Sequence, residues 1–362
     1  MRGKGLPDDP AVRALRLFSA QGVGPRGVAR VRERWTFDAL AGARDDTLDP
    51  IERRVRDALL RPVRGENRQI ATWRERYHLL TPEHPDWPQR LQRLPDPPVW
   101  LFVDGRLPTF DLPSVVIVGT RRPSAYGRSI ASTLARDLAD AGVTIGSGLA
   151  YGIDAAAHQG SLAASRGGFA VVAHGLDMTA PQRNAALRAA MVAAEGGILT
   201  EYPPEQAPDV HQFPARNRLL AALADAVVVV EGARRSGSLI TAELALDIGV
   251  DVLAVPGRVG DAMAEGPLGL LRKGCAPAVC ADDILAAVGW VRRALVDASS
   301  VPEYGRAIWE ALPPHGALHL DELSERTGRS VEALLPDLLQ LELSGWIDAQ
   351  PGQYYGRAAP VR

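Results

Sequence analysis

The middle of the chain repeats one pattern, which limits its fold more than any other feature. Short apolar runs alternate with glycine-bearing polar loops, and each loop precedes a stretch long enough for a helix. Continuous apolar runs such as the valines 227–230 are typical of strands buried on both faces of a parallel sheet. The pattern predicts a Rossmann-like α/β fold, with a doubly wound and mainly parallel sheet, over residues 114–290. Its strands are expected at residues 114–118, 143–145, 169–173, 198–200, 226–230 and 252–255.

An all-helical domain is predicted over residues 1–75. Helices at residues 15–19 and 27–35 flank a turn with the glycine–apolar–glycine pattern of a helix-hairpin-helix, whose backbone N–H groups bind a DNA phosphate without reading bases. The domain holds 16 Lys and Arg against 11 Asp and Glu, a net charge of +5 that suits a phosphate backbone. A plain helical hairpin with a solvated arginine face is the alternative. The candidate secondary DNA-binding residues are Gly22, Gly24, Arg26 and Arg30.

Two further segments complete the chain. Residues 76–113 are rich in proline, which cannot continue a helix, and they predict a linker or an edge extension. Residues 302–358 read as three helices and a β-hairpin, the plan of a winged-helix domain. Its third helix carries Glu332, Asp337 and Glu342 and no basic residue, so protein interaction or packing is expected there rather than base reading.

Composition excludes several kinds of chemistry. Lys4 and Lys273 are the only lysines, so a phosphate-loop lysine or a Schiff base has almost no candidate. Cys275 and Cys280 have no histidine or second cysteine pair nearby, so neither a disulfide framework nor a metal site is expected. The chain has no apolar N-terminal segment and no run of eighteen apolar residues, which predicts a cytoplasmic protein with no membrane partner. No cofactor is expected.

Four loops at the carboxyl ends of the predicted strands carry the chemistry. Glycine lets an anion approach the backbone, a helix N-terminus presents free N–H groups, and arginine adds a bidentate cation. Several such loops in a row suit a polymer of phosphates better than a mononucleotide. Aromatic residues in the same loops could stack unpaired bases. The candidate site residues are Gly119, Thr120, Arg121 and Arg122; Ser147 and Gly148; Phe213, Arg216, Asn217 and Arg218; and Ser236, Gly237 and Ser238.

Two side chains of the second loop have simple structural interpretations. Asp154 falls where the following helix starts, so we expect it to be the N-cap of that helix. His158, four residues later, is expected to pack in the core and not to act as a catalytic base.

Taken together, the loop motifs resemble the DNA-processing protein A (DprA/Smf) family. The resemblance rests on residues 116–121, 147–158, 213–218, 236–242 and 254–257, in order along the chain. It implies a non-enzymatic protein that binds single-stranded DNA, forms homodimers and loads the RecA recombinase during natural transformation. It also implies that Arg121 grips phosphate, that Gly148 lines the groove, and that Phe213, Arg216 and Asn217 contact the strand. Tyr151 departs from the family pattern, which commonly has arginine there.

Two other functions remain to be weighed. Nucleotide phosphoribohydrolases of the lysine-decarboxylase-like family share the fold. Residues 236–243 match the glycine motif of that family only in part, because Glu243 is one residue too close to Thr241. That spacing turns the carboxylate off the face that would meet the sugar. An NAD-dependent or ATP-hydrolysing protein is disfavoured because no G-x-x-x-x-G-K-[ST] occurs and no G-x-G-x-x-G follows the first strand.

Overall fold

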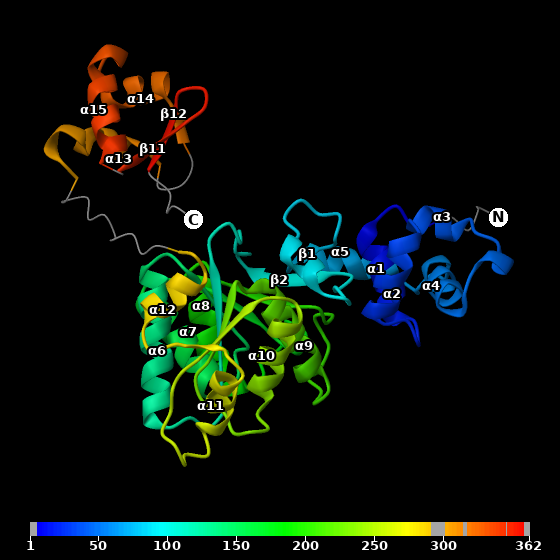
Figure 1. Cartoon of the computed structure of the whole chain (residues 1–362). Coiled ribbons are helices and arrows are strands. Elements are labelled where there is room, and N and C mark those ends of the chain that lie inside the picture. Colours follow the sequence, from blue (N-terminus) through cyan, green and yellow to red (C-terminus); the bar gives the residue numbers. More distant parts are fainter. Residues whose placement is uncertain (1–5, 291–300, 314–316, 345, 358–362) are drawn as a thin grey trace. The chain divides into compact units, whose positions relative to one another are not determined.

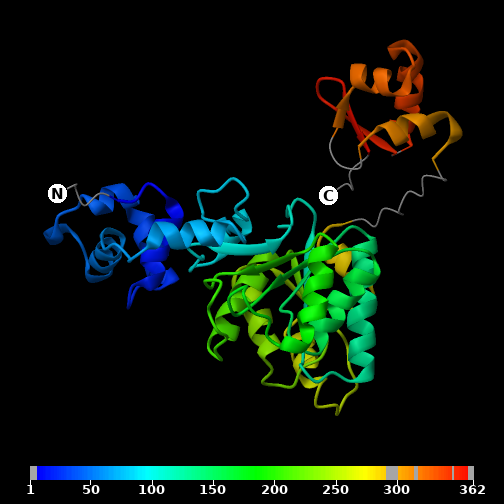
Figure 2. The same ribbon diagram turned by 180° about the vertical axis from the view of Figure 1, so that it is seen from behind.

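The computed structural model describes residues 6–290, 301–313, 317–344 and 346–357. The chain divides into two compact units, Met1–Val288 and Gly289–Arg362. Figure 1 and Figure 2 show the ribbon from opposite sides, coloured along the sequence.

The first unit is built on a mainly parallel sheet, as predicted. Strand β3 lies between β4 and β7, so the chain reverses its direction of travel across the sheet at this point. Helices therefore cover both faces, and the predicted doubly wound Rossmann-like fold is confirmed. In order across the sheet, the strands are β1 (His78–Leu80), β2 (Leu101–Gly105), β6 (Gly197–Thr200), β5 (Phe169–Val171), β4 (Thr144–Ser147), β3 (Ser114–Val118), β7 (Ala226–Val229), β8 (Asp251–Ala254) and β9 (Ala276–Pro277).

The helices of the two faces follow the direction of the strand connections. In Figure 1, α6, α7 and α8 lie on one side of the sheet and α9 and α10 on the other. Leu219 and Leu223 of α9 and Ala242 of α10 share a core with Val116 and Val229 of the sheet. The bounds are α6 (Ala125–Asp140), α7 (Ile153–Ala163), α8 (Ala185–Ala193), α9 (Gln212–Leu223), α10 (Gly237–Asp247), α11 (Glu265–Arg272) and α12 (Ala281–Ala287), with a short 3₁₀ helix η3 (Gln182–Asn184).

The N-terminal helices share a hydrophobic core with one edge of this sheet. Leu15 of α1 and Trp73 of α5 are buried with Phe102 of β2 and Ile198 of β6. Part of the proline-rich segment thus contributes strands: β2 pairs antiparallel with β6, and β1 pairs with β2. The helical elements before the sheet are α1 (Pro10–Ser19), α2 (Pro25–Arg34), α3 (Phe37–Ala41), η1 (Asp45–Thr47), α4 (Pro50–Leu60), α5 (Glu66–Arg74) and η2 (Gln89–Arg93).

The second unit has the predicted winged-helix composition of three helices and a hairpin. In it Ile308, Leu323, Leu334 and Leu341 form a separate core. Its third helix exposes leucines and acidic side chains. The elements are η5 (Glu303–Gly305), α13 (Arg306–Ala311), β10 (Ala317–His319), α14 (Leu320–Thr327), α15 (Val331–Leu343), β11 (Ile347–Gln350) and β12 (Tyr354–Arg357), and the strand order is β10-β12-β11.

No helix in the part of the chain that the structure describes is both long and apolar enough to cross a membrane.

Candidate nucleic-acid interface

A pocket of about 250 Å³ opens at the carboxyl ends of β3, β4 and β7, where the direction of the chain across the sheet reverses. Open α/β sheets bind ligands at this place because the loops on either side diverge. All four predicted loops contribute to the pocket, which we call the rim pocket. The candidate residues that line it are Gly119, Thr120, Arg121, Phe213, Arg216, Asn217, Ser236, Gly237 and Ser238.

The start of helix α9 supplies one wall of the rim pocket. Phe213, Arg216 and Asn217 are spaced at i, i+3 and i+4, so they project from one side of the helix. The Asn217 side chain bridges to the opposite wall, because its Nδ2 donates to the Gly237 carbonyl at 3.4 Å. The rim pocket is therefore closed on this side by a hydrogen bond between α9 and α10.

Arg121 and Phe213 meet across the rim pocket. The Arg121 guanidinium lies 5.0 Å from the centre of the Phe213 ring, within the range of a cation–π contact. Arg121 is exposed and the ring is half-buried. A cation and an aromatic face, both accessible, are the two groups that a phosphate and an unpaired base require.

The loop after β3 is held by Glu231 at the end of β7. The Thr120 N–H donates to the Glu231 carbonyl at 2.7 Å, and the Ser124 N–H and hydroxyl donate to its carboxylate at 2.9 and 2.5 Å. Ser124 also caps α6 by accepting from the Gly127 N–H at 3.0 Å. The start of α6 is therefore not as free as was expected, because Ser124 caps one of its N–H groups and the Glu231 carboxylate lies beside the cap.

A buried charge pair supports the floor of the rim pocket. The Arg216 guanidinium donates to the carbonyls of Gly148, at 3.0 Å, and Val171. Burial lowers the pKa of Arg216 to about 10, against the opposing effect of Asp154, and burial raises the pKa of Asp154. Asp154 accepts from the N–H groups of Gly148 and Ala150 at 3.2 and 3.3 Å. The predicted N-cap role of Asp154 is wrong, because Gly152 occupies that position.

Several candidate residues lie outside the rim pocket. Ser147 is fully buried, and its hydroxyl donates to the Ile117 carbonyl at 2.6 Å. Gly148 lies beneath the floor, where an added Cβ would come within 2.6 Å of the Arg216 Nη2. Arg122 is exposed on the same loop as Arg121 but does not line the pocket.

Arg218 lies on the other side of α9. Its Nη2 donates to the Glu201 carboxylate at 2.6 Å, and its Nε lies 3.6 Å from the Asp96 carboxylate. Burial raises the pKa of Glu201, while the Arg218 charge opposes that shift. Arg216 and Arg218 therefore face different environments although only one residue separates them.

The interpretation of His158 as a core residue is confirmed. The ring is fully buried, and neither nitrogen has a hydrogen-bond partner among the residues that the structure describes. Burial, and secondarily the charge of Arg216, lower the pKa of His158 to about 3. The imidazole is therefore neutral near pH 7.

The N-terminal hairpin is separate from the rim pocket. Gly22 has φ +73°, a left-handed conformation that favours glycine, and Gly24 is the N-cap of α2. Arg26 is exposed, and Arg30 pairs with Asp49 at 2.7 Å. Among the described residues, no group of three His, Cys, Asp or Glu side chains is arranged to hold a metal ion.

Sequence reasoning missed Glu231 and the supporting role of Asp154. A signal for Glu231 was present, since an acidic residue directly ends the apolar run of β7 in a loop otherwise rich in arginine.

Comparison with known proteins gives the same family that the loop motifs resemble. Residues 78–289 match the family model of DNA recombination-mediator protein A, and residues 297–353 match the DprA winged helix domain. Protein Smf of Escherichia coli (strain K12) is 36% identical over 297 residues, which cover 79% of each chain. DNA processing protein DprA of Bacillus subtilis (strain 168) is 37% identical over 222 residues, 60% of this chain and 73% of that protein.

Two solved structures are also similar. DNA processing protein A from Streptococcus pneumoniae has a TM-score of 0.64 and 28% identity, covering 75% of this chain and 95% of its own. DNA processing protein A from Helicobacter pylori, described for its single-stranded DNA binding mode, has a TM-score of 0.53 and 32% identity, covering 59% of this chain and 96% of its own. The family model matches more than half of the chain, and Protein Smf is more than 30% identical over most of both chains, so the chain belongs to the DNA-processing protein A (DprA/Smf) family.

Proposed function

We propose that the chain binds single-stranded DNA along the rim pocket and acts in DNA processing. The observation that carries the proposal is the contact between Arg121 and Phe213, which places a cation and an accessible ring on facing walls. A phosphate would pair with the guanidinium, and a base would stack on the part of the ring that the guanidinium leaves uncovered. Duplex DNA hides its base faces, so this pair of groups favours a single strand.

The walls suit a continuous strand with no base preference. Asn217, Ser236 and Ser238 give the walls a polar lining, and buried Arg216 adds positive charge beneath them. Contacts to the phosphates and sugars of a DNA strand position the strand without reading its base sequence. The relative from Helicobacter pylori, described for single-stranded DNA binding, supports the same ligand class here.

The proposed function is non-enzymatic. The phosphoribohydrolase alternative needs a carboxylate facing the sugar, and Glu243 instead pairs with Lys273 at 3.8 Å, with both side chains more than half exposed. Asp154 lines the pocket but is buried against Arg216 and two backbone N–H groups. Neither carboxylate is placed to act on a bound sugar.

We further propose that the protein is a cytoplasmic homodimer that loads RecA on the bound strand in natural transformation and recombination. The family description, DNA recombination-mediator protein A, supports the loading role. For the dimer, β9 is the last strand of the sheet in the described residues, so its outer edge is open to a second copy.

Fluorescence anisotropy with labelled single-stranded and duplex oligonucleotides tests the ligand. The wild-type protein should bind the single strand more tightly, and Arg121→Ala should weaken that binding; equal affinity for duplex would overturn the proposal.

Separate experiments test the other parts of the proposal. Release of ribose phosphate from nucleoside monophosphates, lost in Glu243→Ala, would support the phosphoribohydrolase alternative instead. RecA filament growth on strands coated by single-strand binding protein should be faster with this protein than without it, and a mass of one chain in light scattering would contradict the dimer.

A further inference from the structure

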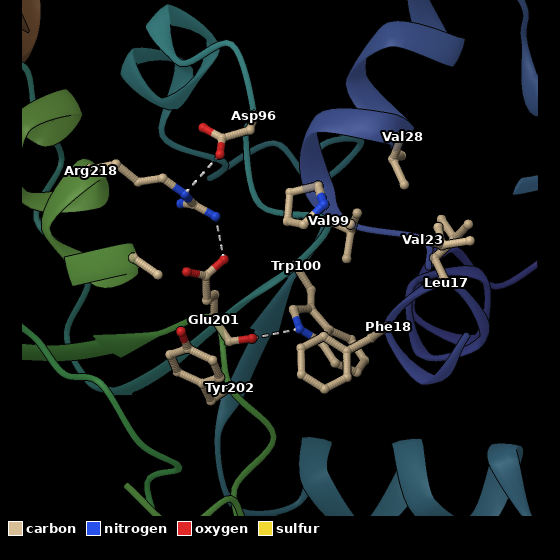
Figure 3. Close-up of a pocket in the computed structure, with 13 residues that line it drawn as sticks. Leu17, Phe18, Val23, Val28, Asp96, Val99, Trp100, Glu201, Tyr202 and Arg218 are labelled. Atoms are coloured by element: carbon tan, nitrogen blue, oxygen red, sulfur yellow. Dashed lines mark hydrogen bonds and ion pairs between the residues drawn. The ribbon is translucent and has the colours of Figure 1, made fainter. Parts of the chain in front are cut away.

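A second pocket, of about 270 Å³, lies between the N-terminal hairpin and helix α9. Figure 3 shows its side chains, which come from the end of α1, the hairpin turn, the segment before β2, the end of β6 and α9. Helix α9 separates it from the rim pocket: Phe213 and Arg216 line the rim pocket, whereas Ala215 and Arg218 line this one. We call it the hairpin pocket.

The walls of the hairpin pocket are apolar and partly aromatic. Phe18 is 40% exposed although it lies at the wall, and its ring is 5.3 Å from the buried Trp100 ring. Tyr202, half-buried, comes from the end of β6 on the other side, as Figure 3 shows. Val23 and Val28 complete the hairpin side. An exposed ring at an apolar wall is suited to stacking on another flat ring.

One polar group of the hairpin pocket is left without a partner. Arg218 is 7% exposed, and its other nitrogens face Glu201 and Asp96. Its Nη1 is buried and finds no hydrogen-bond partner in the described part of the chain. A buried guanidinium N–H without an acceptor is costly, so a ligand whose acceptor this N–H meets after a small rotation of the guanidinium would be favoured.

An uncapped helix start lies at the wall of this pocket. Helix α2 is ten residues long, its N-cap is Gly24, and no side chain caps it. The N–H groups of its first turn, at Arg26 and Gly27, have no partner within the helix. Gly24 lines the pocket, and an added Cβ there would meet no atom within 4 Å. Uncapped helix starts bind phosphate.

We infer that the hairpin pocket takes one unpaired nucleobase of a DNA strand whose neighbouring nucleotides lie on the rim. The base would stack on Phe18 and accept a hydrogen bond from Arg218 Nη1, while its phosphate sits at the start of α2. Every base carries an acceptor, so no base is selected. The net charge of +5 in residues 1–75 favours a polyanion as the occupant over an acidic peptide of few charges. This inference rests on the proposed function.

Two variants of the full-length protein test the inference. Phe18→Leu keeps the apolar contact with Trp100 but removes the ring, and Ala215→Trp fills the pocket from an exposed position of α9. Both should weaken binding of long thymidine oligonucleotides about tenfold, the effect of losing one stacked base. Neither should change the affinity of oligonucleotides too short to reach beyond the rim. Tyr354→Ala, which removes a ring of similar exposure in the winged-helix unit, is the matched control and should have no effect at any length.

A single 2-aminopurine moved along the long oligonucleotide gives a second readout. With wild-type protein its fluorescence should change strongly at one position near an end of the bound segment, and Phe18→Leu should abolish that change. If wild-type protein binds no single strand, the rim proposal fails and this inference fails with it. If Arg121→Ala weakens binding but both hairpin-pocket variants match wild type at every length, the rim proposal stands and this inference is overturned.

Discussion

The guanidinium of Arg121, in the loop after β3, lies 5.0 Å from the centre of the Phe213 ring at the start of α9. The two residues belong to different motifs and are joined only by the topology of the sheet. Their contact brings the β3 loop and α9 together over the rim pocket, so the two side chains are expected to act on a ligand as a unit.

A double-mutant cycle on Arg121 and Phe213 measures this coupling. Arg121→Ala and Phe213→Ala should each weaken single-strand binding, and the double variant should lose less than the sum of the two. The difference is expected to be about 0.5–1 kcal/mol, the strength of a cation–π contact at an exposed site. The measurement is the dissociation constant by anisotropy at fixed salt. If the losses in binding free energy of the two single variants add up to that of the double variant, the two side chains act independently on the DNA.

Gly148→Ala should destabilise the floor of the rim pocket. The new methyl group would come within 2.6 Å of Arg216 Nη2 and 2.7 Å of Asp154 Oδ2, so the buried pair must shift. We expect a loss of about 1–3 kcal/mol in the free energy of unfolding by urea, together with weaker DNA binding. Gly269→Ala is the matched control, because its Cβ would meet nothing within 4 Å in helix α11. A stable Gly148→Ala protein would contradict the close packing described for the floor.

His158 should make the protein less stable as pH falls. Its pKa is about 3 in the folded protein and about 6.5 when unfolded, so the unfolded chain binds a proton first as pH drops below about 6.5. Between those two pKa values, this one histidine should lower the free energy of unfolding by up to about 1.4 kcal/mol for each unit that the pH falls.

Urea unfolding from pH 7 to pH 4 checks the histidine prediction. His158→Leu should flatten the profile relative to wild type, since the buried ring is replaced by an apolar side chain. His78→Leu, at an exposed position of β1, is the matched control for the exchange of a histidine for leucine. Parallel profiles for wild type and His158→Leu would show that His158 does not titrate differently in the two states.

Much of the fold could be predicted because its signals are local. Each buried parallel strand is a continuous apolar run, and the structure places strands at all six predicted positions, with ends shifted by at most two residues. Strands β1 and β2 were not predicted individually, because they are short, lie among prolines and pair antiparallel over a long sequence separation. Pairing of that kind leaves no periodic signal in the sequence.

The site was harder to predict than the fold. The glycine and arginine motifs lie around one pocket at the carboxyl ends of the strands, where they were expected, and the spacing of Phe213 and Asn217 agrees with one side of a helix. Sequence could not distinguish Arg121, which is exposed, from Arg216 and Arg218, which are buried and bound to backbone carbonyls or carboxylates. Those partners come from other segments of the chain, and only the folded chain brings them together.

The salt dependence of single-strand binding tests the central claim most directly. If the rim holds phosphates, the logarithm of the association constant should fall linearly with the logarithm of salt concentration, by about 0.7 for each phosphate contacted. Arg121→Ala should reduce that slope by about 0.7, because one phosphate contact is lost. An unchanged slope in Arg121→Ala, or a flat salt dependence in the wild-type protein, would contradict the claim that this rim grips the backbone of a DNA strand.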